Sequence, residues 1–324
     1  MNVTRRGLLV MGAGTAVAAA AGTTAAAAGT GPGTISNHHL ARSLHGGFSS
    51  HYATVNGVRL HYVAGGHGEP LILLHGWPQT WWEFSKVMPA LARHYRVIAV
   101  DLRGGGASDK PEGGYDKKTM ARDIAELIRA LGYDSAHVAG HDIGSIVGYS
   151  LAANHPERLR KLAMLAVTHP DESYYEFRML PKPEDPFHLW WFAFTQVREL
   201  PEQLVEGRSR FLIDWMLDNA MQNPAAVTDF DRRVYAQAYD SRDTIRGTNG
   251  WYQAFGQDIA DMATYAPVST PILGMADGFF YTSMSQTLPQ VAKDVTLKEV
   301  TGAGHYFIEE KPDMVADELI GFFG

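Results

Sequence analysis

A short glycine-flanked run at residues 140–144 places a carboxylate where a tight turn can expose it. The run Gly-His-Asp-Ile-Gly follows an apolar segment that ends at Ala139, and it opens a stretch with helical periodicity. Small residues on both sides leave room for the strained strand-to-helix turn that lifts the central side chain above a sheet. A carboxylate in that position attacks saturated carbon, whereas its attack on an ester would give only an anhydride. Asp142 is therefore a candidate nucleophile for alkyl transfer, and the chemistry of an esterase, lipase or peptidase is disfavoured.

A histidine and a second carboxylate follow this nucleophile along the chain. His305 comes just after the last expected strand, where the general base stands in triads of this order. It would take a proton from the water that hydrolyses the alkyl-enzyme ester. Asp277 follows the strand expected at 271–275 and would hold the tautomer of His305 and stabilise its imidazolium. Asp171 is a rival for that role, but its displacement toward an insertion favours Asp277.

A glycine-containing turn before the nucleophile supplies candidate hydrogen-bond donors. His75-Gly76-Trp77-Pro78 follows the first buried apolar run. The backbone N–H groups of Trp77 and Ile143 are expected to form an oxyanion hole for the hydrolysis of the ester.

Composition bounds the partners of the site. The chain contains no cysteine, which excludes disulfides, thiolate metal sites and a cysteine nucleophile. His38 and His39 lie in a polar stretch and are interpreted as part of a solvated tail, so no metal and no cofactor are expected. The net charge of −7 without a basic patch argues against nucleic acid. A small apolar electrophile and water are the expected partners, and the oligomeric state stays open.

The elements that would position these residues alternate between strands and helices. A hairpin turning at Asn56-Gly57 comes first, and short apolar runs typical of buried strands follow it. Helical periodicity stands at 117–131 and 145–153. This alternation predicts an α/β fold with a mostly parallel, doubly wound sheet. The buried runs lie at residues 71–74, 97–100, 136–139, 162–167, 271–275 and 296–300.

A segment without strands interrupts this alternation. Residues 169–266 are rich in aromatic side chains and methionine and are expected to be mostly helical. An insertion at this point would cap the carboxyl ends of the strands, the edge at which open α/β sheets bind ligands. The predicted organisation is a core of residues 51–168 and 267–324 with a helical cap of residues 169–266.

The N-terminus has the composition of a targeting segment. Arg5 and Arg6 precede a modestly apolar tract of small residues with A-x-A sites, so residues 1–30 are interpreted as an export signal. The adjacent arginines favour the twin-arginine pathway over an ordinary secretory signal. Residues 31–50 are expected to be a linker. Beyond this segment no apolar run is long enough to span a bilayer, so an exported protein without a stable membrane partner is expected.

From about His51 to its end, the chain resembles the epoxide hydrolase branch of the α/β-hydrolase superfamily. This branch uses an aspartate nucleophile and is related to haloalkane and haloacetate dehalogenases. The resemblance implies an α/β-hydrolase fold and the roles given above for Asp142, His305 and Asp277. It also implies that Tyr252 is the cap residue that donates a proton or hydrogen bond to the epoxide oxygen. The shared motifs are HGWPQTWWEF at 75–84, DLRGGGASDKP at 101–111, GHDIGS at 140–145, NGWY at 249–252 and GAGHYFIEEKP at 302–312.

The chain departs from this family pattern at the second cap donor. By alignment on residues 200–202, that position falls at Trp190 or Trp191, with His188 nearby, and all three are candidates for the substrate pocket. An indole N–H is a good halide donor, so a dehalogenase is an alternative. The haloacetate enzymes, however, carry arginines after the nucleophile, and this chain has Ile143 next. The haloalkane enzymes have tryptophan directly after the nucleophile. A further alternative is a hydrolase fold with a different or no catalytic role.

Overall fold

An eight-stranded sheet forms the centre of the computed structural model, which describes residues 34–180, 182 and 188–324. The strands lie in the order β1-β2-β4-β3-β5-β6-β7-β8. Strands β3 to β8 run parallel to one another, and the β1–β2 hairpin joins β4 in antiparallel fashion. The strands are β1 (Ser49–Val55), β2 (Val58–Gly66), β3 (Glu69–Leu74), β4 (Tyr95–Val100), β5 (Ala136–His141), β6 (Leu159–Leu165), β7 (Ile272–Asp277) and β8 (Val295–Val300).

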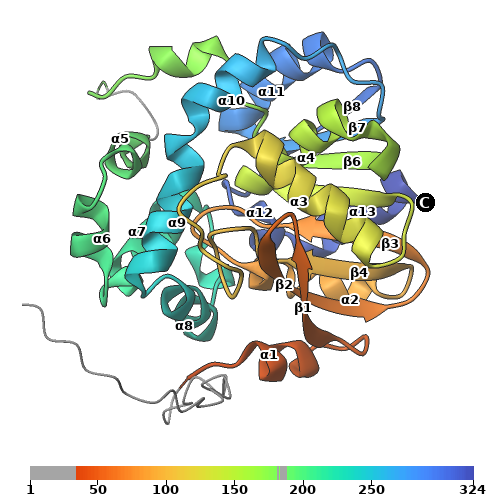
Figure 1. The fold of residues 1–324 in the computed structure, drawn as a ribbon, viewed down its shortest axis with the longest axis horizontal. Coiled ribbons are helices and arrows are strands. Elements are labelled where there is room, and N and C mark those ends of the chain that lie inside the picture. Colours follow the sequence, from red (N-terminus) through yellow and green to blue (C-terminus); the bar gives the residue numbers. More distant parts are fainter. Residues whose placement is uncertain (1–33, 181, 183–187) are drawn as a thin grey trace, which may run out of the picture. The chain divides into compact units, whose positions relative to one another are not determined.

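Helices of the core cover both faces of this sheet (Figure 1). Successive strand residues point to opposite faces, so Ile72 and Leu74 of β3 join one core cluster whereas Leu71 and Leu73 join the other. The first cluster includes side chains of α3 (Lys117–Ala130), α4 (Ile143–Asn154) and α11 (Gly278–Val291). The second includes side chains of α1 (Asn37–Ser43), α2 (Met88–Leu91), α12 (Phe307–Glu310) and α13 (Pro312–Phe323).

Part of the expected N-terminal linker is a folded segment of the core. The predicted export signal at residues 1–30 lies outside the described residues. The expected linker at residues 31–50 contains helix α1, and β1 begins inside it at Ser49. Leu40 and Ala41 of this helix are buried in the second core cluster. The polar, glycine-rich composition hid these two apolar positions, so the interpretation of residues 37–43 as linker is wrong.

The segment between β6 and β7 is mostly helical in its described residues. It contains η3 (Glu172–Glu176), α5 (Trp190–Gln196), α6 (Leu200–Val205), α7 (Ser209–Ala220), η4 (Pro224–Ala226), α8 (Asp229–Ala238), α9 (Arg242–Gln253) and α10 (Phe255–Met262). In Figure 1 these helices, coloured green to blue, lie to one side of the sheet. They form the cap.

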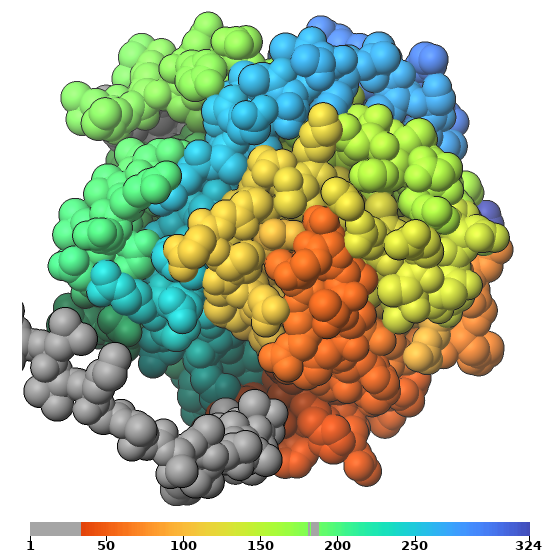
Figure 2. Space-filling view, in the orientation of Figure 1, coloured from red at the N-terminus to blue at the C-terminus, as the bar shows by residue number. Residues whose placement is uncertain are grey.

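Buried polar contacts fasten this cap to the core. Lys117 Nζ of α3 donates to Asp258 Oδ2 of α10 at 2.8 Å, and both side chains are almost completely buried. Trp251 Nε1 of α9 donates to the carbonyl of Arg103 at 2.7 Å. In the space-filling view, the cyan and blue atoms of α9 and α10 lie directly against the yellow atoms of the core (Figure 2). The cap is therefore a packed part of the molecule.

Two features are absent from the part of the chain that the structure describes. None of its helices is both long and apolar enough to cross a bilayer. Within the same residues, no three His, Cys, Asp or Glu side chains are grouped as a metal site would require.

Candidate active site

The backbone at Asp142 has a positive φ, which is unusual for a residue other than glycine. Asp142 is the residue between β5 and α4, with φ 49° and ψ −117°. Such strained conformations cost about 1–3 kcal/mol and persist only where the surroundings impose them. A Cβ at Gly140 would lie 2.1 Å from the carbonyl oxygen of Gly144, and one at Gly144 would lie 2.0 Å from that of Leu74. The two glycines thus permit the turn that exposes the Asp142 side chain.

Different groups hold the two carboxylate oxygens of Asp142. Oδ1 accepts the backbone N–H of Trp77 at 2.9 Å. Oδ2 lies 3.6 Å from Nε2 of His305. Ile143 is the first residue of α4, so its N–H has no intrahelical partner, and the residue lines the same pocket as Asp142. The structure therefore brings Trp77, Ile143 and His305 around the carboxylate.

The charges around Asp142 keep it ionised. Burial by itself would raise the pKa of this carboxyl group. The histidines His305 and His141 and the N–H of Trp77 lower it by more, so the pKa lies below its ordinary value. The ionised form is the one that attacks carbon.

The expected link between His305 and Asp277 is not formed. Asp277 ends β7 and precedes α11, and it shares a cavity with His305. His305 Nδ1 and Asp277 Oδ1 are both buried, and neither has a hydrogen-bond partner. Burial raises the pKa of Asp277, and the nearby His305 lowers it by less. His305 and Asp277 are thus neighbours without a hydrogen bond between them, and the role of Asp277 stays a prediction.

The rival carboxylate is engaged elsewhere. Asp171 Oδ1 accepts the N–H of Ser173 at 2.9 Å and also its hydroxyl at 2.5 Å. These bonds begin the short helix η3. Asp171 is not among the residues that line either cavity at His305.

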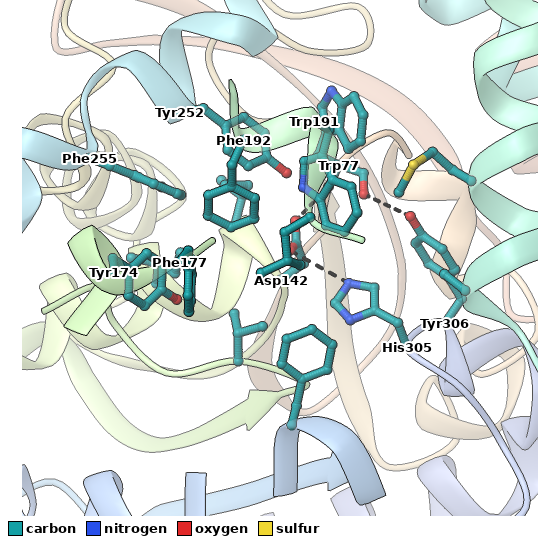
Figure 3. Close-up of a pocket in the computed structure, with 17 residues that line it drawn as sticks. Trp77, Asp142, Tyr174, Phe177, Trp191, Phe192, Tyr252, Phe255, His305 and Tyr306 are labelled. Carbon is teal, nitrogen blue, oxygen red and sulfur yellow. Dashed lines mark hydrogen bonds and ion pairs between the residues drawn. The ribbon is translucent and has the colours of Figure 1, made fainter. Parts of the chain in front are cut away.

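An aromatic pocket stands above Asp142 (Figure 3). Tyr252 of α9 is 2% exposed and packs edge-on against Trp77 with ring centroids 5.6 Å apart. In Figure 3 its hydroxyl points into the pocket on the side of Asp142. Burial, followed by the negative charge of Asp142, raises the pKa of Tyr252 well above its ordinary value. The phenol therefore keeps its proton and can donate it only to a strong base such as an alkoxide.

Only one of the other cap candidates lines this pocket. Trp191 is buried in its wall, beside Tyr252. Trp190, the preceding residue of α5, faces away and packs against Trp215 with ring centroids 5.1 Å apart. Neighbouring residues of a helix point in directions about 100° apart, so both indoles could not face the substrate. His188 is exposed and outside the pocket. The expectation that Trp190 and His188 line the pocket is therefore wrong.

Two tyrosines at the site escaped the sequence reasoning. Tyr306 donates its hydroxyl to the carbonyl of Trp77 at 3.2 Å, so it positions the peptide whose neighbouring N–H reaches Asp142. Tyr174 of η3 lines the pocket, and burial followed by the charge of Asp142 raises its pKa. The signal for Tyr174 was its place soon after β6, because side chains there gather at the carboxyl edge of the sheet.

The buried pair of Glu83 and His141, next to Asp142, was also not predicted from the sequence. Glu83 Oε2 accepts the N–H of Gly76 at 3.2 Å and lies 3.4 Å from His141 Nδ1. His141 Nε2 is 3.0 Å from the carbonyl oxygen of His305. Burial lowers the pKa of His141, but Glu83, Asp142 and the carbonyl of His305 together raise it by more, and the net pKa is above its ordinary value. Through these contacts, Glu83 and His141 link the loops of Gly76 and His305 to β5.

Comparison with known proteins agrees with this fold. A profile of the α/β hydrolase fold matches residues 69–205. The chain is 32% identical to the soluble epoxide hydrolase of Corynebacterium sp. (strain C12) over 84% of its own length and 96% of that protein. It is 35% identical to a fluoroacetate dehalogenase of Burkholderia sp. over 85% of its length and 94% of that protein. The solved structure of the epoxide hydrolase CorEH superposes with a TM-score of 0.76 at 32% identity, covering 85% of this chain and 98% of that one.

These similarities, together with the parallel sheet and the turn at Asp142, define the class of the protein. The chain belongs to the α/β-hydrolase family and is a hydrolase with epoxide hydrolases among its relatives.

Proposed function

We propose that this hydrolase opens small apolar epoxides to diols through a covalent ester on Asp142. The observation that carries the proposal is the placement of a buried phenol, Tyr252, in the same apolar pocket as an ionised carboxylate. An epoxide needs both groups, because its carbon is attacked while its oxygen leaves as an alkoxide that must be protonated.

The first step would form the ester. Asp142 Oδ2, the oxygen not held by Trp77, attacks an epoxide carbon, and the carbon–oxygen bond of the ring breaks. The alkoxide takes the proton of Tyr252. Oδ1 stays in the hydrogen bond from Trp77 and becomes the carbonyl oxygen of the ester.

The second step would release the diol. Water adds to Cγ of Asp142 while His305 Nε2 takes one of its protons, and the N–H groups of Trp77 and Ile143 stabilise the oxyanion. Collapse of this intermediate breaks the bond between Cγ and the former Oδ2, which leaves as an oxygen of the diol, while the oxygen of the water stays on Cγ. One proton of the water ends on the released hydroxyl, and the other passes from His305 to restore the phenol of Tyr252. Asp142 is again a carboxylate.

Dehalogenation is the second candidate, because Trp191 offers an indole wall to the pocket and one relative is named a fluoroacetate dehalogenase. A haloacid substrate fits poorly, since no Arg or Lys of the described chain lines this pocket. Its carboxylate would be buried without a counter-charge, which is costly. A neutral haloalkane has no carboxylate to bury, so halide release must be assayed as well as diol formation.

The decisive experiment traps the ester. His305→Gln should react with an epoxide substrate but fail to release it. Intact-protein mass spectrometry should show one added substrate mass, and the modified peptide should contain Asp142. In a single turnover of the parent enzyme in heavy-oxygen water, the label should enter the Asp142 carboxylate. Label in the first diol would show that water attacks the substrate directly, and the ester mechanism would be wrong.

A further inference from the structure

A second cavity reaches His305 from outside the aromatic pocket. It is lined by Asp277, Gly304 and His305 on the core side and by Asn219, Met221 and Gln222 on the cap side. Asn219, Gln222 and the neighbouring Phe279 are exposed, so this cavity opens at the surface.

The two cavities share part of their walls. Ala220, Phe280 and His305 line both. The Phe280 ring packs on the His305 ring with centroids 5.2 Å apart. Phe280 and Ala220 therefore stand between the two spaces, and His305 borders both of them.

The room available to water differs between them. The aromatic pocket holds about 40 Å³ of space for water-sized molecules, whereas the second cavity holds about 170 Å³. A single water needs roughly 10–15 Å³ by this measure, so the second cavity can hold several waters. Its polar lining includes the side chains of Asn219, Gln222 and Asp277, which can hydrogen-bond them.

Hydrolysis of the ester requires water at a moment when the aromatic pocket is full. The alkyl group bound to Asp142 then occupies this narrow pocket and blocks its small free space. Water must therefore reach His305 by another path. We propose that the second cavity is a water channel that supplies the hydrolytic water to His305 while the substrate occupies the aromatic pocket; this rests on the proposed ester intermediate.

The channel separates the two half-reactions physically. Substrate arrives on the side of Tyr252 and Trp191, and water arrives on the side of Asp277 and Gln222. The water gives its proton to His305 Nε2 and its oxygen to Cγ of Asp142, as in the second step above. Closing the channel should therefore slow ester hydrolysis and leave ester formation unchanged.

The test plugs the outer end of the channel. Gln222→Trp introduces a large side chain at an exposed residue that lines the channel but not the aromatic pocket. The matched control is Gln286→Trp, at an exposed position of α11 that lines neither cavity. Rapid quench followed by intact-protein mass spectrometry measures ester formation and ester decay separately, with an epoxide or haloalkane that the parent enzyme turns over.

We expect ester decay in Gln222→Trp to slow by about tenfold or more, so that the ester accumulates during turnover. The rate of ester formation should equal that of the parent and of Gln286→Trp, which also verifies folding. If decay is unchanged in Gln222→Trp and in the double variant with Asn219→Trp, the water channel is wrong although the ester mechanism stands. Equal slowing of both steps would also overturn it, since substrate and water would then share one path. If no substrate ever forms an ester, the proposed function and the channel fall together.

Discussion

In the proposed first step, Tyr252 would act as the acid and Asp142 as the nucleophile, and the pKa values of these two groups are shifted in opposite directions. Burial and the charge of Asp142 raise the pKa of the phenol, whereas the histidines and Trp77 outweigh burial and lower that of the carboxyl group. Such divergence between neighbouring groups is typical of an acid and a nucleophile in one site. Both groups are thereby in the required protonation state at neutral pH.

Removing the phenol should slow formation of the ester. Tyr252→Phe keeps the ring that packs on Trp77 but loses the proton donor, so alkylation of Asp142 should slow by about a hundred- to ten-thousandfold. Single-turnover kinetics with an epoxide measures this rate. Tyr239→Phe, which removes a buried phenol outside the pocket, is the control and should retain the parent rate. A fully active Tyr252→Phe would show that another group, such as the phenol of Tyr174, protonates the oxygen.

A buried acid behind the site should make stability depend on pH. Glu309 accepts a hydrogen bond from Tyr235 at 2.7 Å, yet burial raises its pKa from 4.5 to about 8. The folded state therefore keeps a proton that the unfolded state releases between these values. The free energy of unfolding should then fall as pH rises through this window, by up to about 1.4 kcal/mol per pH unit.

Neutralising this acid should remove that dependence. Glu309→Gln keeps the size of the side chain but cannot titrate, so its unfolding free energy should vary less between pH 5 and pH 8. Denaturant unfolding at several pH values measures the difference. Glu299→Gln, at an exposed position, should keep the slope of the parent. Parallel curves for Glu309→Gln and the parent would show that Glu309 is already ionised in the folded protein.

At the scale of elements, the apolar runs predicted each central strand because a buried parallel strand is apolar on both faces. The turn at Asp142 was also predictable, because only glycine, which lacks a Cβ, fits at positions 140 and 144. Contacts between distant segments were not predictable. Whether Trp190 or Trp191 faces the substrate depends on how α5 packs against α9. The burial of helix α1 depends on contacts with residues further along the chain, such as the hydrogen bond from Trp81 Nε1 to Asn37 Oδ1.

The turn itself gives a sharp test of the fold. Gly144→Ala would place a Cβ 2.0 Å from the carbonyl oxygen of Leu74, so β3 and α4 would have to move apart. We expect a loss of several kcal/mol in unfolding free energy, in the range of strained core substitutions. The matched control is Gly321→Ala in α13, where a Cβ meets nothing within 4 Å; it should stabilise the helix by about 1 kcal/mol. Thermal unfolding of both variants decides, and equal melting temperatures would contradict the tight turn.

At the scale of the whole molecule, the site draws on segments spread from Trp77 to Tyr306, so it exists only in the complete fold. This bears on how the protein would leave the cell. A twin-arginine signal carries proteins that have already folded. We therefore propose that folding and assembly of the site precede export.

If export follows the twin-arginine pathway, it should depend on Arg5 and Arg6. Arg5→Lys combined with Arg6→Lys should leave the precursor in the cytoplasm while the enzyme stays folded and active there. Fractionation followed by immunoblotting and an activity assay measures both properties. Unchanged export of the double variant would rule out the twin-arginine pathway and favour an ordinary secretory signal.

The attachment of the cap has a consequence for how substrates are admitted. Lifting the cap from the core would separate Lys117 from Asp258 and break the hydrogen bond from Trp251 Nε1 to the carbonyl of Arg103. We therefore expect a substrate to enter the aromatic pocket through side-chain movements at its edge, where Phe177 is 43% exposed. With the cap held in place, we expect a change of substrate selectivity to require substitutions at the edge of this pocket.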